Sequence, residues 1–425
     1  MTIRFKFIFL LLISASTVGF GQTVRSPYTI QGIGDIQVPA LVPNRGMGDL
    51  GLSYGSFWHL NNQNPALLVN NGFTTFSMGG VADSRTTSTN TAQQQNTTGT
   101  LDYIALGIPV QSGKWSMSFG VNAYSTVDYN IVTLDTTTIQ DSNLRTTFLG
   151  EGGLNQLFIA SGHRITKELS VGVKASYLFG PIEKETIITV DNTTDIDPAD
   201  VTAFVDRVTY SDVTVGFGLS YRKEIKEKLR LNAGLVYDLQ TKLTGEEFKR
   251  IESRIIENDP TPIVSDTLAF EQSGSITLPQ RLGFGISMDK ENKWMIGMDL
   301  AIQNWEDYES FDKSAHNLEN SYKFAVGGYF IPDIASVKSY LKRMTYRAGF
   351  SYEATPYSLN NEQINEMGFT AGFSFPVKGL STVDLAVKYG IRGKTENNLI
   401  REEYFKIYLG VSFNDAPWKK RPIYN

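Results

Sequence analysis

Cysteine is absent from this 425-residue chain. Its absence excludes a disulfide scaffold, a zinc ribbon, a thiol nucleophile and an N-terminal Cys that carries lipid. Histidine is also scarce: His59, His163 and His316 are the only three, and their spacing does not indicate a metal site. The 39 basic and 44 acidic residues leave a net charge of −5, without the basic excess that nucleic acid requires. We therefore expect no catalysis, no cofactor, no metal and no nucleic-acid partner.

Long hydrophobic runs are missing as well. No segment reaches the roughly 18 apolar residues that a transmembrane helix needs. The longest apolar stretch lies at the N-terminus, where Arg4 and Lys6 precede the apolar residues 7–13, and Gly19 and Gly21 precede Gln22. This three-part pattern predicts a signal peptide over residues 1–21. We expect an exported protein that is not held in the membrane by a helix.

What the sequence has in abundance is alternation of apolar and polar residues. Within residues 169–179, Leu169, Val171 and Val173 alternate with Ser170 and Gly172, and the pattern continues to the end of the segment. A period of two residues is that of a β-strand, and the 12% of aromatic residues also favours β-structure. About fourteen strands are predicted, at 73–80, 101–110, 114–130, 154–164, 168–180, 207–222, 228–241, 275–288, 292–306, 320–331, 343–353, 366–377, 381–392 and 400–413.

The two faces of these strands favour a membrane barrel. The apolar face carries no charge over nine or more residues in many strands, which suits a tilted crossing of the hydrocarbon. The other face mixes Gly and Ser with charges such as Lys174, Arg222 and Arg347, as the wall of a partly filled lumen does. A large soluble β-sandwich or propeller is the alternative, but no blade-like repeat is present. We predict an all-β protein, a transmembrane antiparallel β-barrel of the outer membrane over 73–413, with a periplasmic tail at 414–425.

The connections between the predicted strands alternate in length. Short ones at 111–113, 223–227, 289–291 and 378–380 would be periplasmic turns. Long ones at 81–100, 131–153, 181–206 and 242–274 would be outer loops, which is the asymmetry expected of an outer-membrane barrel.

Residues 45–68, RGMGDLGLSYGSFWHLNNQNPALL, fit neither a helix nor a strand. Glycines at 46, 48, 51 and 55 and an Asn-Pro pair interrupt both, yet the segment is too apolar for a solvated linker. Irregular backbone is tolerated at membrane depth only where protein encloses it. We therefore expect residues 22–72 to form a hatch inside the lumen, with candidate residues Arg45, Gly46, Met47, Gly48, Phe57, Trp58, Asn64 and Pro65.

Two of the predicted outer loops contain helix-like patterns. Residues 197–208 begin with an Asp-Pro pair suited to a helix N-terminus, and residues 246–258 place apolar side chains at helical spacing. Each predicted helix either covers its own part of the rim or packs against the other to form a hydrophobic groove. The groove residues would be Val201, Phe204, Val205, Phe248, Ile251 and Ile255.

Taken together, these segments resemble the FadL-like outer-membrane transporters of hydrophobic compounds and their relatives in Bacteroidota. The Arg-Gly-Met-Gly segment and the Asn64-Pro65-Ala66 triplet are similar to the hatches of that family. The resemblance implies a fourteen-stranded barrel, an N-terminal hatch and a greasy groove formed by helices of the third and fourth outer loops. It also implies passive uptake of fatty-acid-like or aromatic compounds, with outer-membrane lipids and hydrophobic small molecules as partners.

The alternative function is that of a structural barrel subunit in a larger envelope complex, for secretion or outer-membrane assembly. Its partners would be other envelope proteins. An apolar cavity that runs continuously from the outer rim to the hatch would distinguish a transporter from such a subunit.

Overall fold

The computed structural model describes residues 26–136, 143–191, 200–255, 262–311, 318–377 and 381–415. The predicted signal peptide and the tail beyond Asp415 lie outside the described residues. No helix in this part of the chain has the length and apolar character needed to cross a membrane. The short helices are η2 (Pro27–Ile30), α2 (Val42–Arg45), η3 (Pro65–Asn70), η4 (Trp305–Asp307), α3 (Tyr340–Arg343) and η5 (Glu396–Asn398).

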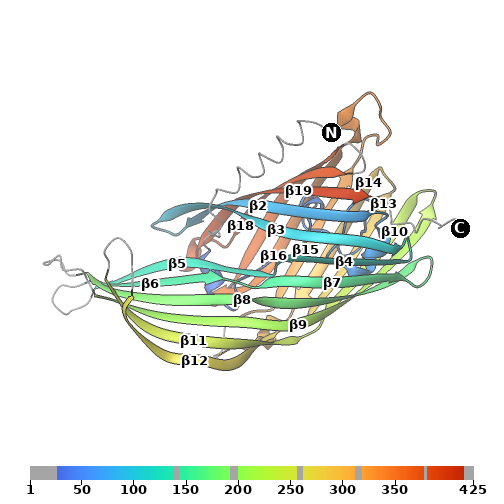
Figure 1. Cartoon of the computed structure of the whole chain (residues 1–425). Coiled ribbons are helices and arrows are strands. Elements are labelled where there is room, and N and C mark those ends of the chain that lie inside the picture. The colour runs from blue at the N-terminus through green and yellow to red at the C-terminus, as the bar shows by residue number, and fades with distance from the viewer. Residues whose placement is uncertain are drawn as a thin grey trace, which may run out of the picture.

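Strands make up most of the molecule, and each pairs antiparallel with its neighbours (Figure 1). In chain order they are β1 (Asp35–Ile36), β2 (Thr74–Ser88), β3 (Gln93–Gln111), β4 (Trp115–Ala123), β5 (Ser125–Thr136), β6 (Asn143–Gly152), β7 (Asn155–Arg164), β8 (Leu169–Asp191), β9 (Asp200–Lys226), β10 (Leu229–Asp238), β11 (Thr241–Ile255), β12 (Pro262–Leu278), β13 (Arg281–Lys290), β14 (Trp294–Gln303), β15 (Ser321–Phe330), β16 (Thr345–Leu359), β17 (Glu362–Pro376), β18 (Thr382–Arg392) and β19 (Arg401–Asp415).

The sheet closes on itself because β19 pairs with β2 along its whole length, from Asp415 beside Thr74 to Arg401 beside Ser88. Short interruptions divide single wall strands into β4 and β5, β7 and β6, β10 and β11, and β13 and β12. Counting each of these pairs as one strand gives a closed antiparallel barrel of 14 strands. The predicted fold class and strand number are confirmed, and each predicted span overlaps a strand of the barrel.

Side chains of the wall alternate between lipid and lumen as the sequence pattern predicted. In β8, Val173, Tyr177 and Phe179 are exposed on the outer face. Ser176 and Leu178, which lie between them, are buried. Because an exposed apolar belt is stable only in hydrocarbon, this face is the one that meets the bilayer.

Beyond the membrane belt, β5, β6, β11, β12 and the outer parts of β8 and β9 continue as a projecting sheet, hereafter the outer sheet (Figure 1). The two predicted loop helices are therefore wrong. The described residues of 197–208 belong to β9 and those of 246–258 to β11, and the two segments pair with each other. The helical signal is overridden because pairing with β8 and β12 satisfies the backbone of both segments. The expected long loop at 81–100 is also mostly strand, since β2 and β3 extend into it.

The outer half of the wall contains a seam. After Tyr124 the chain leaves β3, and β5 pairs with β6 instead. Residues 93–101 of β3 pair only with β2 within the described part of the chain. The hatch occupies part of this seam, because β1 pairs with the start of β5, Asp35 beside Thr126. At the seam, therefore, one strand of the hatch is part of the wall, while the rest of the hatch lies in the lumen.

Candidate functional site in the lumen

A row of glycines in the wall forms the seat of η3. Gly162, Gly172 and Gly218 lie side by side on β7, β8 and β9. A Cβ atom on Gly218 would lie 2.2 Å from Asn64 Oδ1, and one on Gly172 would lie 2.4 Å from the backbone of Pro65. Glycine is required at these positions because backbone or side-chain atoms of the hatch approach the wall this closely.

Asn64 fastens this part of the hatch. Its side chain is fully buried; Oδ1 accepts a hydrogen bond from the backbone N–H of Ala66 at 3.0 Å. Nδ2 donates to the carbonyl oxygens of Leu52, at 2.7 Å, and Leu219 in β9, at 3.1 Å. The Asn-Pro-Ala triplet is thus a short helix start whose cap also bonds to the wall.

The glycine-rich first part of the hatch is enclosed in the same way. Gly48 has a φ of 72°, and its N–H donates to Thr370 Oγ1 at 2.8 Å. The Asp299 carboxylate accepts the N–H groups of Gly51 and Leu52 at 2.8 and 2.9 Å. These wall side chains replace water as partners of irregular backbone, which explains how such a segment is stable inside a barrel.

The apolar hatch residues pack against the wall. Met47 and Leu50 form a buried cluster with Met295 and Ala325, and Leu52 fills the space above Gly283. These side chains are in contact with the barrel, and Met47 also borders a cavity of about 100 Å³ that is lined by both polar and apolar groups.

Buried ion pairs join the hatch to the wall. Arg45 lies 3.2 Å from Asp49 and 3.5 Å from Asp102 in β3. Asp49 also lies 3.1 Å from Lys323 in β15, which pairs with Glu353 at 3.3 Å. Burial alone would raise the pKa of Asp49, but Lys323 and Arg45 hold the pKa below its ordinary value. The hatch carboxylate is therefore ionised and bound from two sides.

A second network lies nearer the outer side. Asp35 of β1 lies 3.0 Å from Arg392, which also contacts Glu366 at 2.6 Å. Glu402, which has no exposed surface, lies 2.7 Å from Arg85 and 3.9 Å from Arg392. Removing one member of such a network leaves buried charge without a partner, so the network resists displacement of the hatch.

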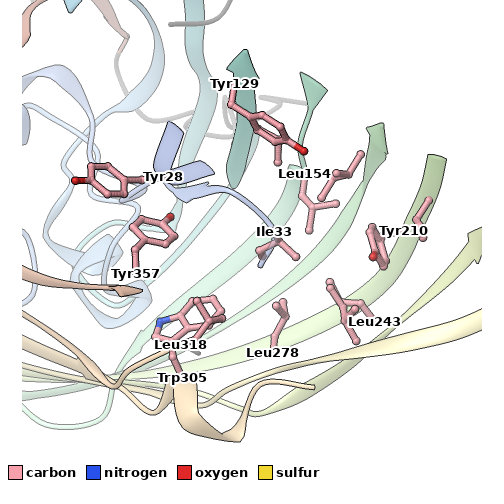
Figure 2. Close-up of a cluster of buried hydrophobic side chains, with 14 of the residues drawn as sticks. Tyr28, Ile33, Tyr129, Leu154, Tyr210, Leu243, Leu278, Trp305, Leu318 and Tyr357 are labelled. Carbon is pink, nitrogen blue, oxygen red and sulfur yellow. The ribbon is translucent and has the colours of Figure 1, made fainter. Parts of the chain in front are cut away.

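Above these charges, apolar side chains close the lumen. Figure 2 shows Tyr28 and Ile33 of the hatch among residues of the surrounding wall, including Tyr129, Tyr210 and Tyr357. Tyr28 stacks on Tyr357 with ring centroids 6.5 Å apart and donates a hydrogen bond to the carbonyl of Ile400. The hatch therefore supplies part of an apolar core in the outer half of the barrel.

The cavities that remain are small and lined by both polar and apolar groups. One of about 130 Å³ lies beside residues 36–39 and has Lys174, Asp238 and Arg281 in its wall together with Leu278 and Trp305. One of about 80 Å³ lies at the seam, and one of about 100 Å³ lies at the end with the short turns. None of these cavities runs from the outer rim to the opposite end of the barrel.

The predicted groove residues do not share one surface. Phe204 and Ile251 are cross-strand neighbours, so they lie on the same face of the outer sheet. Val201 and Val205 alternate with Phe204 along β9 and therefore lie on the other face, where both are buried. Phe248 also lies on that other face, beneath the guanidinium of Arg250. For Ile255 the structure gives only its place in β11.

Phe57 and Trp58 lie at the end of the barrel opposite the outer sheet. They line a cavity together with Glu291 and Asn292 of the short β13–β14 turn, and Phe57 is half exposed. Sequence reasoning missed the charges that hold the hatch, because Asp35 lies far along the chain from Glu366, Arg392 and Glu402. For Glu366, Arg392 and Glu402, their positions on the lumen face of strands with an alternating pattern were an available signal.

The fold is that of a FadL-like outer-membrane barrel. The chain is similar to a FadL homologue from Pseudomonas aeruginosa at 11% identity, with a TM-score of 0.56 over 90% of this chain and 99% of that one. It is similar to the toluene transporters TbuX of Ralstonia pickettii and TodX of Pseudomonas putida at 15% and 14% identity. Both give a TM-score of 0.55 over 91% of this chain, and over 99% and 100% of the respective transporter.

At the level of sequence, the BamG family model matches residues 1–425, and the chain belongs to the BamG family. No curated protein matches it in a sequence search.

Proposed function

We propose that this protein is a structural barrel subunit of a larger envelope complex in the outer membrane, of the secretion or outer-membrane assembly kind. One observation carries the proposal: the hatch fills the lumen and is tied to the wall by two buried ion-pair networks. A transporter needs a passage through the lumen for its substrate. A subunit that binds partner proteins on its outer surface needs no such passage, and a filled, rigid barrel is suited to that role.

The outer sheet offers surfaces for such contacts. Leu134, Leu268 and Phe270 are 66%, 61% and 69% exposed on β5 and β12, on strands that project beyond the membrane belt. Large apolar side chains exposed to water in this way are typical of protein contact sites.

The test is extraction of the protein from its own cells in a mild detergent, followed by native mass measurement. We expect a complex of fixed stoichiometry, and we expect Leu134→Asp with Leu268→Asp and Phe270→Asp to release the barrel as a single subunit. Thr133→Asp with Thr267→Asp, on the same two strands, is the matched control and should keep the complex. A wild-type barrel that runs alone, or a triple variant that keeps its partners, contradicts the proposal.

Passive uptake of hydrophobic compounds, fatty-acid-like or aromatic, is the second candidate. The seam favours it, because β3 and β5 do not pair within the described residues, and the hatch strand β1 lies at the seam paired with the start of β5. Displacement of β1 would open a lateral path from the lumen. The likeness of the fold to toluene transporters supports the same function.

Phe204 and Ile251 are cross-strand neighbours on one face of the outer sheet, where the exposed Phe204 can contact an incoming compound. Each buried CH₂ group of a ligand gains about 0.8 kcal/mol. Phe204→Asp with Ile251→Asp should therefore lower uptake of radiolabelled oleate or toluene into cells. Phe248→Asp, on the opposite face of β11, should not. If cells with the wild-type protein take up no more of either compound than cells that lack the protein, this function is excluded.

A further inference from the structure

The end of the lumen that opens toward the periplasm contains a cavity lined by arginines, hereafter the mouth pocket. Its volume is about 100 Å³, and hatch residues 54–61 form one side. Arg222, Arg230 and Arg347 extend into it from β9, β10 and β16, whereas Glu291 is the one carboxylate in its lining. Glu291 lies in a short turn, which places the pocket at the periplasmic end.

Two of these arginines lack an acidic partner. Arg222 donates from Nε to Asn232 at 2.9 Å and from Nη2 to the carbonyl of Gly55 at 3.1 Å. Arg347 donates from Nη1 to Ser374, is 8% exposed, and its Nε has no hydrogen-bond partner. Within the described residues, neither guanidinium lies within 4.0 Å of a carboxylate oxygen.

A third guanidinium without an acidic partner among the described residues lies behind the lining of the pocket. Arg164 of β7 donates to Oδ1 of Asn70 at 2.9 Å, and Asn70 lines the pocket. By contrast, the arginines of the outer half of the lumen, such as Arg45, Arg85 and Arg392, each contact at least one carboxylate. Among the described arginines that face the lumen, those without an acidic partner therefore gather at the periplasmic end.

The acids nearest the pocket are already engaged. Asp289 and Glu291 both pair with Arg230, at 2.6 and 3.5 Å. Asp384 lies behind Ser374, to which it is hydrogen-bonded, and 3.4 Å from His59 Nε2; it is not part of the lining. Arg222 and Arg347 thus line the cavity without a carboxylate partner, and the Nε of Arg347 has no hydrogen-bond partner.

Guanidinium groups held in a pocket lose hydration, and an oxyanion that accepts their hydrogen bonds restores the lost interactions. We propose that the mouth pocket binds a phosphate-type oxyanion, as free phosphate or as the headgroup of a lipid. Phe57, Trp58 and Phe73 pack at the rim with ring centroids 5.1 to 5.5 Å apart, and Phe57 is 50% exposed. This aromatic rim would contact the apolar part of a lipid ligand and so increase its affinity. Free phosphate has no apolar part and would not gain affinity from the rim.

The experiment is calorimetric titration of the full barrel, in a neutral maltoside detergent, with inorganic phosphate and with dodecyl phosphate. Binding of both probes with similar affinity identifies free phosphate as the ligand, and much tighter binding of dodecyl phosphate identifies a lipid headgroup. Arg222→Gln and Arg347→Gln should each weaken binding about tenfold or more, since each removes hydrogen bonds to a charged group.

Arg281→Gln is the matched control, because Arg281 also faces the lumen but pairs with Asp238 at 3.1 Å far from the mouth. It should leave both affinities unchanged. Arg222 also bonds to the hatch, so the Arg347 variant separates loss of the site from a shifted hatch. The proposal is overturned if the wild-type barrel binds neither probe, or if Arg281→Gln weakens binding as much as the mouth variants do.

Discussion

The same strands behave differently within the membrane wall and in the outer sheet. In the wall part of β9, Val213 and Phe217 face lipid and are about half exposed. Farther along the same face, Val201 and Val205 are buried, and the charged side chains of β8 and β11 that flank them include the Arg254–Glu185 pair at 2.5 Å. Lipid on one face enforces apolar residues at every second position, whereas water on both faces permits several arrangements. Alternation is therefore a reliable guide only in the wall.

The sharpest test of this difference is a charge on the lipid face of the wall. Val173→Arg should prevent assembly, because Arg near the bilayer midplane costs roughly 2–4 kcal/mol. The heat-modifiable folded band should disappear on a gel. Lys174→Gln, one residue along and facing the lumen cavity, should keep the band. Equal behaviour of the two variants would show that the facing of β8 is wrong.

The next largest effect is expected where hatch and wall share charges. Asp49→Asn leaves Arg45 and Lys323 with one carboxylate each, Asp102 and Glu353. Breaking a buried pair typically costs about 3–5 kcal/mol, and the remaining partners reduce that loss.

The variant should lose its folded band at a lower temperature and expose the hatch to protease. Glu362→Gln removes an exposed pair with Lys394 and should change neither property. If Asp49→Asn is as stable as the wild type, the ion pairs do not hold the hatch.

A smaller loss of stability is expected from substituting a glycine of the wall, and no loss from substituting a glycine beyond the wall. Gly218→Ala places a Cβ against Asn64, and overpacking of this kind costs about 1–3 kcal/mol. Gly99→Ala, in the outer part of β3, meets one atom at 3.8 Å and should be neutral. Thermal unfolding of the two variants, followed by the folded band, makes the comparison. Equal unfolding temperatures would indicate that η3 is not seated on the glycine row.

The smallest effect is expected in the outer sheet. Leu268→Arg makes the same kind of change as Val173→Arg, but the side chain is 61% exposed on a strand beyond the lipid belt. Surface substitutions of this kind usually stay within about 0.5 kcal/mol. The folded band should form in normal yield. Failure of this variant to assemble would place the outer sheet in the membrane.

Sequence reasoning identified the wall, but it failed on the outer sheet. Residues 197–208 have apolar side chains at 201, 204, 205 and 208, a spacing compatible with one face of a helix. The structure places Phe204 and Val205 on opposite faces of a strand. Nothing in the local sequence distinguishes a helix from a strand here. The strand forms because β8 and β11 provide hydrogen-bond partners for its backbone on both sides.

What the sequence determined by itself is the barrel wall, since lipid imposes a period of two that each strand must carry in its own residues. It also determined that residues 45–68 need an enclosure, because their glycines and Asn-Pro pair exclude regular structure. Only the tertiary structure decided how the lumen is filled. Asp49 meets Lys323 across 274 positions of the chain, and Arg222 and Arg347 meet at one mouth from strands that are not neighbours. Such pairings arise when the barrel closes, because closure brings inward-facing residues from distant strands to the same depth.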